Sequence, residues 1–323
     1  MRHITAEDIA RTLTYSELVE ALRRAFRDDI RVPIRHHHTI PTPGGDATLL
    51  LMPAWKGDRT FIGCKFLTVF PDNATRGKPS VYGSYLLLAG ASGEPLAVMD
   101  GRELTAWRTA AASALAATYL ASPRASHLVM IGAGALAPHL IAAHAAVRPV
   151  RQVTLWNRTR ARAEMLADKL AGRGMIVAVT DNLEAALGSA DIVSCATLTH
   201  EPLVRGVLLK AGAHVDLVGG FTPAMREADD ATVRRASLYV DTREGAREKA
   251  GDIVDPIRRG IIKEHDVRGD LFELCRGTSP GRRSTDEITL FKSVGSALED
   301  LAAAMLVWER LANSPPAANE LAG

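Results

Sequence analysis

The chain is poor in cysteine and in net charge, and it has no long apolar run. Its 323 residues contain three cysteines without C-x-x-C spacing, Cys64, Cys195 and Cys275, which is typical of a reducing cytoplasm and not of a disulfide framework. The formal net charge is +2, so no broad surface for nucleic acid or membrane is expected. No apolar run approaches the ~18–20 residues of a membrane span, and the first residues lack a secretory apolar core. We expect a cytoplasmic protein that binds neither nucleic acid nor membrane.

A glycine-containing turn between an apolar strand and a helical segment is the most informative feature present. The apolar run 127–131 is followed by Gly132 and Gly134, with Ala137 in the third small position. The first glycine makes a tight turn, the second lets backbone approach a pyrophosphate, and the third allows close helix packing. Free N–H groups at the helix start bind the anion. A second strand, 152–156, ends where the ribose should lie, so the sequence predicts a dinucleotide site.

The residues after this second strand bear on the choice of cofactor. A site for NAD usually has Asp or Glu here, and a carboxylate would repel the 2′-phosphate of NADP. This chain has Asn157, Arg158 and Thr159, followed by Arg160 and Arg162. Such groups suit a phosphate dianion, so NADPH is predicted, although neutral and basic residues do not repel NADH. In the alternative interpretation, Asn157 and Thr159 only cap the next helix and the arginines are its solvated face.

Strand and helix patterns alternate from about residue 127 to residue 241, as a doubly wound parallel sheet requires. Six strands make a full Rossmann set, which predicts an α/β domain over residues 119–295. The strands are expected at 127–131, 152–156, 175–179, 191–196, 213–218 and 237–241, with helices at 159–170 and 182–188.

The segments outside this region predict an α+β domain formed by residues 1–118 and 296–323. The C-terminal helix expected at 296–311 would return to pack on the N-terminal part. An alanine-rich helix at 104–120 would lead into the nucleotide-binding domain. The remaining elements are a helix near 16–28 and strands at 47–52, 61–70 and 84–89.

Three cations stand out in the N-terminal part, namely Arg35, Lys65 and Arg108. Each alone could be structural, since Lys65 could point outward by strand alternation. Together they would form a clamp for an anion. The histidines 36–38 invite a metal interpretation, but neighbouring residues on a strand point to opposite faces and no acidic or thiol partner stands nearby. We predict no metal, and favour surface or packing roles, or one histidine as a pocket proton donor.

Several ordered motifs spread over nearly the whole chain resemble the ornithine cyclodeaminase and mu-crystallin family. The resemblance implies a Rossmann domain inserted in a substrate-binding and dimerisation domain, a homodimer, and an active site between the domains. The motifs are LLMPAW, the lysine of CKFLTVF, LAVMDGRELTAWRTAAASALA, IGAGALA, WNRTR, LVGGFTPAMRE, LYVDTREGA and ITLFKSVGSALEDLAAA.

The resemblance also implies roles for individual residues. Arg35, Lys65 and Arg108 match positions that hold the substrate carboxylate and are the catalytic candidates, and Val294 falls near the substrate. The residues that match cofactor positions, together with the two glycines of the turn and Val218 of the cofactor cleft, are Ser80, Gly132, Gly134, Ala135, Leu136, Asn157, Arg158, Thr159, Thr197, Val218 and Ser293.

One departure from the family pattern separates its branches. The cyclodeaminases have an aspartate two residues before the proline of the LVGGFTPAMRE motif, where it handles the substrate amine. Here that residue is Phe221, which offers neither charge nor base and would wall an apolar ring. Asp216 is the neighbouring acid that would replace the aspartate, but it lies within a strand and is expected to serve structure.

The sequence therefore favours the ketimine reductase branch, with a small cyclic imino acid as substrate. The expected reaction is NADPH-dependent reduction of Δ1-pyrroline-2-carboxylate or Δ1-piperideine-2-carboxylate to L-proline or L-pipecolate. Three alternatives stay open: an NAD-dependent ornithine cyclodeaminase, an alanine dehydrogenase, and an NADPH-dependent small-ligand binder without turnover. The sequence does not fix ring size or the proton donor.

Overall fold

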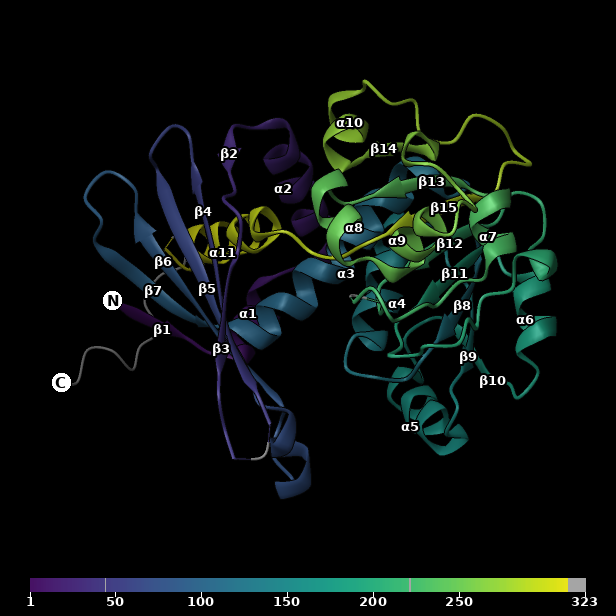
Figure 1. Ribbon diagram of the computed structural model, residues 1–323, viewed down its shortest axis with the longest axis horizontal. Coiled ribbons are helices and arrows are strands. Elements are labelled where there is room, and N and C mark those ends of the chain that lie inside the picture. The colour runs from purple at the N-terminus through teal and green to yellow at the C-terminus, as the bar shows by residue number, and fades with distance from the viewer. Residues whose placement is uncertain (44, 221, 313–323) are drawn as a thin grey trace. The chain divides into compact units, whose positions relative to one another are not determined.

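The computed structural model describes residues 1–43, 45–220 and 222–312, which divide into two compact units (Figure 1). Unit 1 comprises residues 1–108 and the chain from residue 297 on, and unit 2 comprises residues 109–296. Helix α3, Gly101–Leu120, passes from the first to the second. The domain boundary expected at residues 118 and 119 therefore falls inside this helix. No helix of the described residues is long and apolar enough to span a membrane.

Unit 1 is built on a seven-stranded sheet of order β1-β7-β6-β5-β4-β2, with β3 also paired to β4. The pairs are antiparallel except for β1 with β7. The C-terminal helix α11 packs against α2, β4 and β5, so its predicted return to the N-terminal part is confirmed. The elements are β1 Arg2–Ile4, α1 Ala6–Thr12, α2 Tyr15–Arg27, β2 Ile30–Arg31, β3 His36–Ile40, β4 Ala47–Lys56, β5 Phe61–Val69, a 3-10 helix η1 at Pro71–Arg76, β6 Val81–Ala89, β7 Pro95–Asp100 and α11 Ala297–Ala312.

The two faces of this sheet differ sharply in exposure. Directly opposed residues of an antiparallel sheet share a face, and the row Met52, Lys65 and Tyr85 is buried. Phe66 and Tyr82 belong to rows of the other face and are 41% and 49% exposed. Lys65 therefore points into the core of unit 1, and its neighbour Phe66 points outward. The alternative in which strand alternation places Lys65 on the surface is wrong.

Unit 2 contains an eight-stranded, fully parallel sheet of order β10-β9-β8-β11-β12-β15-β13-β14 (Figure 1). Parallel strands linked by crossovers through helices are the doubly wound arrangement of a Rossmann fold, so the predicted fold class is confirmed. The strands are β8 His127–Ile131, β9 Gln152–Trp156, β10 Ile176–Val179, β11 Ile192–Cys195, β12 His214–Leu217, β13 Ser237–Val240, β14 Val267–Asp270 and β15 Thr289–Lys292.

The prediction of six strands was wrong, because β14 and β15 were not expected. Strand β15 lies between β12 and β13, so the expected fifth and sixth strands are not neighbours. Both missed strands have four residues and include charged side chains, which conceals them from an apolar pattern. The helices are α4 Ala137–Val147, α5 Arg160–Leu170, α6 Leu183–Ser189, α7 Asp230–Arg235, α8 Arg243–Lys249, α9 Gly251–Arg258 and α10 Leu271–Arg276, with 3-10 helices η2 Gly206–Leu208 and η3 Glu264–Asp266.

Candidate active site

The turn between β8 and α4 is shaped to let a ligand approach its backbone. Gly132 has a φ of +102°, and an added Cβ would lie 2.7 Å from the carbonyl oxygen of Ala196. Only glycine fits there without a shift of backbone. Around Gly134 nothing lies within 4 Å of an added Cβ, so this glycine faces open space. Leu136, the N-cap residue of α4, makes no side-chain capping bond, which leaves the helix start to a ligand anion.

Asn157 ties the glycine turn to the segment after β9. Its Oδ1 accepts a hydrogen bond from the N–H of Ala133 at 3.1 Å, and its Nδ2 donates to the carbonyl oxygen of Thr159 at 2.8 Å. Thr159 occupies the N-cap position of α5 but makes no side-chain capping bond. Simple helix capping therefore does not account for these two residues.

The arginines after β9 differ in what they already bind. Arg160 pairs with Glu164 at 2.8 Å and also with Asp181. Arg158 and Arg162 are exposed, and neither has an ion pair within the described part of the chain. Two guanidinium groups beside the expected ribose position are thus available to an anion.

Three further predicted cofactor residues meet at the carboxyl ends of neighbouring strands. Thr197 follows β11, Val218 follows β12 and Ser293 follows β15. The Val218 N–H donates to the Cys195 carbonyl at 2.9 Å, and the Ser293 N–H donates to the Leu217 carbonyl at 3.0 Å. In open parallel sheets this edge is where ligands bind. The carboxylate of Asp241, which the sequence analysis missed, holds the loop that carries Val294 by accepting its N–H at 2.6 Å.

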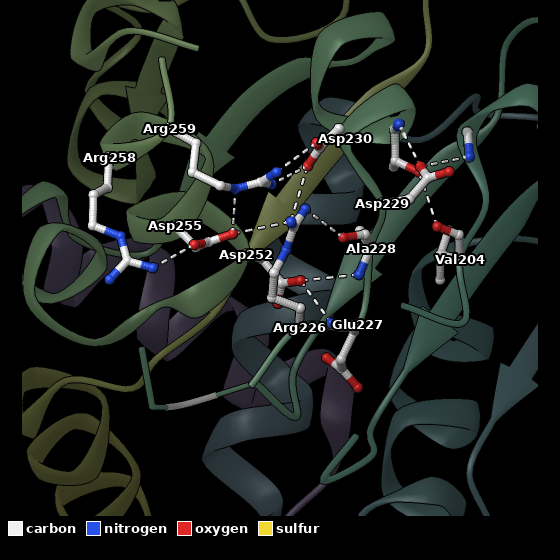
Figure 2. A network of polar contacts seen from close by, with 12 residues as sticks. Val204, Arg226, Glu227, Ala228, Asp229, Asp230, Asp252, Asp255, Arg258 and Arg259 are labelled. Carbon is white, nitrogen blue, oxygen red and sulfur yellow. Dashed lines mark hydrogen bonds and ion pairs between the residues drawn. The ribbon is translucent and has the colours of Figure 1, made fainter. Parts of the chain in front are cut away.

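A second buried carboxylate missed by the sequence analysis is Glu227. Its Oε1 accepts from the Thr197 N–H at 2.7 Å, and its Oε2 accepts from the Gly219 N–H at 2.7 Å. Asp252 of α9 in turn accepts the N–H groups of Glu227 at 2.7 Å and Ala228 at 2.9 Å (Figure 2). The sequence offered one sign of this role: Glu227 is the last residue of the LVGGFTPAMRE motif, and no pattern of surface residues accounts for it.

In unit 1 the structure brings Lys65 and Arg108 together around one carboxylate. The Lys65 Nζ lies 2.7 Å from Asp300 Oδ2, and the Arg108 Nε donates to Asp300 Oδ1 at 2.9 Å. The Arg108 Nη1 also donates to Glu299 Oε2 at 2.7 Å. Both acids lie in the first turn of α11 and are fully buried. Neither acid was predicted from the sequence, although two buried cations require nearby carboxylates.

These charges shift one another's pKa. Burial lowers the pKa of Lys65 to about 8, although Asp300 partly opposes the change. Burial alone would lower the pKa of Arg108, but Asp300 and Glu299 outweigh it and raise that pKa. For Asp300, burial is outweighed by Arg108 and Lys65, and its pKa falls. Lys65 is thus a cation near neutral pH that can lose its proton in a mildly basic solution.

The remaining predicted residues of unit 1 lie nearer the strand ends. Arg35 is half-buried and immediately precedes β3. The pairing of β3 with β4 begins one residue later, at His36 and Leu51. Ser80 immediately precedes β6, and its carbonyl accepts the Phe70 N–H at 2.8 Å.

Two residues concern the branch of the family. Phe221, predicted to line the substrate ring, lies outside the described residues. Asp216 is fully buried in β12, where its Oδ2 accepts from Ser194 Oγ at 2.8 Å and lies 3.1 Å from His144 Nε2. This carboxylate is buried inside unit 2 among its own hydrogen-bond partners, which agrees with the structural role expected for it.

The histidines 36–38 lie on β3, and all three are exposed. His36 and His38 share one face, with ring centroids 6.4 Å apart. Over the described ranges, no group of three or more His, Cys, Asp or Glu could hold a metal ion.

The model of the ornithine cyclodeaminase/mu-crystallin family matches residues 3–314. The chain belongs to this family. Among curated relatives, Delta(1)-pyrroline-2-carboxylate reductase of Colwellia psychrerythraea is 36% identical over 97% of this chain and 100% of its own. Ketimine reductase mu-crystallin of Rattus norvegicus is 34% identical over 84% of this chain and 82% of its own.

Solved structures resemble the chain over its whole length. Delta(1)-pyrroline-2-carboxylate reductase of Thermococcus litoralis, in complex with NADH and L-proline, superposes with a TM-score of 0.90 at 32% identity, covering 97% of this chain and 98% of that one. An archaeal alanine dehydrogenase dimer with bound NAD gives a TM-score of 0.88 at 28% identity, with 98% of each chain covered.

Proposed function

We propose that the chain is an imine reductase that converts a cyclic ketimine carboxylate, Δ1-pyrroline-2-carboxylate or Δ1-piperideine-2-carboxylate, into L-proline or L-pipecolate with NADPH. The observation that carries the proposal is the buried pair Lys65 and Arg108, held side by side on Asp300 in a chain whose full-length relatives are named for this chemistry. Such a pair suits one substrate carboxylate, and a carboxylate fixed by two cations is held in a defined orientation.

The clamp retains donors for a substrate after its internal contacts are counted. Arg108 uses Nε and Nη1 on Asp300 and Glu299, and a guanidinium has five N–H donors in all. Lys65 pairs with Asp300 and approaches Thr105 Oγ1 at 3.5 Å, while an ammonium has three donors. Arg35 completes the clamp in this proposal. The acids thus set the orientation of both cations while leaving donors for a bound carboxylate.

The cofactor supplies the hydride when bound, and the residues of unit 2 fit it. The glycine turn and the uncapped start of α4 would hold the pyrophosphate, with Asn157 at the ribose and Arg158 at the 2′-phosphate. We infer a preference for NADPH, because Arg158 and Arg162 have no internal partner within the described residues and no carboxylate replaces Asn157. The full proposed set comprises Ser80 of unit 1 and, in unit 2, Gly132, Gly134, Ala135, Leu136, Asn157, Arg158, Thr159, Thr197, Val218 and Ser293.

A proton must reach the ring nitrogen unless the imine arrives already protonated. Lys65 can provide it, because its pKa of about 8 leaves it protonated at neutral pH and ready to lose the proton. Phe221 offers no acid or base at the position where a cyclodeaminase has its aspartate. The chain is therefore assigned to reduction and not to deamination.

One assay panel tests the proposal. The purified chain is assayed with NADPH or NADH in the presence of each cyclic imine, and likewise in the presence of pyruvate plus ammonia. A further reaction contains NAD and ornithine. We expect NADPH absorbance to fall with one or both imines, and no oxidation with either imine would refute the proposal. Oxidation with pyruvate plus ammonia alone would instead identify an alanine dehydrogenase, a function favoured by the structural likeness to the archaeal enzyme. Cofactor binding without turnover would identify a binder.

We further propose that the chain works as a homodimer in the cytoplasm. The sheet of unit 1 exposes aromatic side chains on the face opposite Lys65, among them Trp55, Phe66 and Tyr82, and a monomer rarely leaves such a group open. Of the three cysteines, which are all free, none needs an oxidising compartment.

A further inference from the structure

Two carboxylates and one lysine form a buried cluster at the carboxyl ends of the unit 2 strands. The side chains of Glu227, Asp252 and Lys292 are fully buried. The Lys292 Nζ lies 3.2 Å from Asp252 Oδ2 and 3.8 Å from Glu227 Oε2. Burying ionisable groups costs more free energy than an apolar core of the same volume. Packing alone therefore does not account for the cluster.

Glu227 connects two loop segments that would otherwise be independent. Its Oε1 accepts both the N–H of Thr197, at 2.7 Å, and the hydroxyl of Thr197, at 2.9 Å. Its Oε2 accepts the N–H of Gly219 at 2.7 Å and that of Gly220 at 3.3 Å. One carboxylate thus fixes the segment after β11 and the segment after β12 at a common distance, using both oxygens.

Gly219 and Gly220 pack so closely against the first loop segment and against Asp252 that neither position has room for a side chain. A Cβ on Gly219 would lie 1.9 Å from the Thr197 carbonyl oxygen, and a Cβ on Gly220 would lie 2.8 Å from Asp252 Oδ2. Asp252 Oδ1 accepts the N–H of Glu227 itself (Figure 2). The loop segments, Glu227, Asp252 and Lys292 therefore form one continuous packed and charged support.

We propose that Glu227 is a positioning residue for the reduction, and that it holds the segments bearing Thr197 and Val218 in the register that productive cofactor binding needs, with Lys292 and Asp252 fixing its orientation. This inference rests on the proposed function, because Thr197 and Val218 are cofactor residues only there. Hydride transfer depends steeply on the placement of the reacting atoms, and a shift of about 1 Å can cost on the order of a hundredfold in rate.

The test is Glu227→Gln, which keeps the size of the side chain. A glutamine has one acceptor oxygen and an NH₂ group that only donates, so it can hold one of the two segments but not both. We expect kcat to fall by about ten- to a hundredfold, NADPH to bind more weakly, and the primary deuterium isotope effect with 4-deuterated NADPH to grow. The thermal midpoint should also fall, because buried N–H groups of Thr197 or Gly219 lose their acceptor, so kcat and the isotope effect are measured at a temperature where the variant is fully folded.

Glu184→Gln is the matched control, since it removes an exposed carboxylate that pairs with Arg205 in the same unit. It should leave kcat, cofactor binding and the isotope effect unchanged. Lys292→Met gives an independent test should the first variant not fold. It removes the counter-cation of Glu227, and its isotope effect should grow in the same way.

Two outcomes would overturn the inference. One is a folded Glu227→Gln variant with the kcat and isotope effect of the wild type. The other is a loss of kcat that only follows the loss of folded protein. If the wild type reduces no imine, the proposed function fails by itself, and the affinity for NADPH then tests Glu227: weaker binding in the variant supports positioning, and equal binding refutes it.

Discussion

Lys65 occupies a core-facing position of β5 that a hydrophobic side chain would ordinarily fill. It is 1% exposed and lies in a row with Met52 and Tyr85. The charge is tolerated because Asp300 lies 2.7 Å away. The sequence showed that a lysine interrupted an apolar run, but not which way it pointed, because strand alternation alone does not say which face is buried. Its acidic partners are over two hundred residues away along the chain, beyond any local pattern.

The pKa of Lys65 predicts how carboxylate binding changes with pH. With a pKa of about 8, Lys65 is charged below pH 8 and becomes neutral as the pH rises through that value. Pyrrole-2-carboxylate is a planar ring acid without a nitrogen that titrates in this range. Its inhibition constant should be constant at lower pH and rise by up to about tenfold per pH unit above pH 8. In the Lys65→Arg variant the inhibition constant should stay constant across this pH range, because a guanidinium stays charged. A flat profile in the wild type up to strongly basic pH would contradict the assignment.

Asp300→Asn tests the carboxylate that holds both cations. Removing one partner of a buried ion pair costs about 3–5 kcal/mol, so urea denaturation should give a correspondingly lower free energy of unfolding. Asp300 also raises the pKa of Lys65, and the pH break in inhibitor binding should therefore move to lower pH in the variant. Glu20→Gln breaks an exposed pair with Arg23 in the same unit and should change stability by less than about 1 kcal/mol. Equal effects of the two substitutions would argue against a structural role for Asp300.

Among the elements, the mainly apolar strands of the nucleotide-binding part could be predicted and the short polar ones could not. Strands β8 and β9 begin and end where the sequence predicted, because most of their residues are apolar and each is followed by a glycine or a polar residue. Strand β3 carries three histidines and β15 ends in a lysine, and neither pattern suggests a strand. The glycine turn and the segment after β9, on which the proposed cofactor site rests, could therefore be located from the sequence, since they follow β8 and β9. The supports Glu227 and Asp241 could not, because only tertiary packing shows that they are buried.

The segment after β9 carries a prediction about cofactor choice. Arg158→Ala should weaken NADPH by roughly ten- to a hundredfold, the value of one charge-assisted hydrogen bond of about 1.5–3 kcal/mol, and leave NADH nearly unchanged. The comparison is made by measuring kcat/KM with each cofactor. Arg160→Ala is the control, because Arg160 already pairs with Glu164 and Asp181 and should affect both cofactors equally. If kcat/KM fell by the same factor with NADH as with NADPH in the Arg158→Ala variant, the contact between Arg158 and the 2′-phosphate would be contradicted.

On the scale of the whole molecule, the open face of the unit 1 sheet carries a prediction about assembly. Phe66 lies on this face and is 41% exposed. A charge there would be desolvated in a dimer that buries the face. If the proposed homodimer forms through this face, Phe66→Glu should convert it to a monomer in analytical ultracentrifugation without loss of helix signal. Met165→Glu, at an exposed apolar position of unit 2, should leave the mass unchanged. A wild type that sediments as a monomer would refute the dimer.

The position of β15 has a consequence for how the chain folds as it is synthesised. Until residues 289–292 leave the ribosome, β12 and β13 lack the strand that joins them, so we expect the sheet to form in at most two parts, one ending at β12 and the other formed by β13 and β14. Each part then has an unpaired parallel edge, and pairing across large sequence separations is slow. A nascent chain stalled before residue 289 should expose both edges and recruit chaperones. Pairing of residues 289–292 with both edges joins the two parts, so the full sheet forms only after this late segment is available.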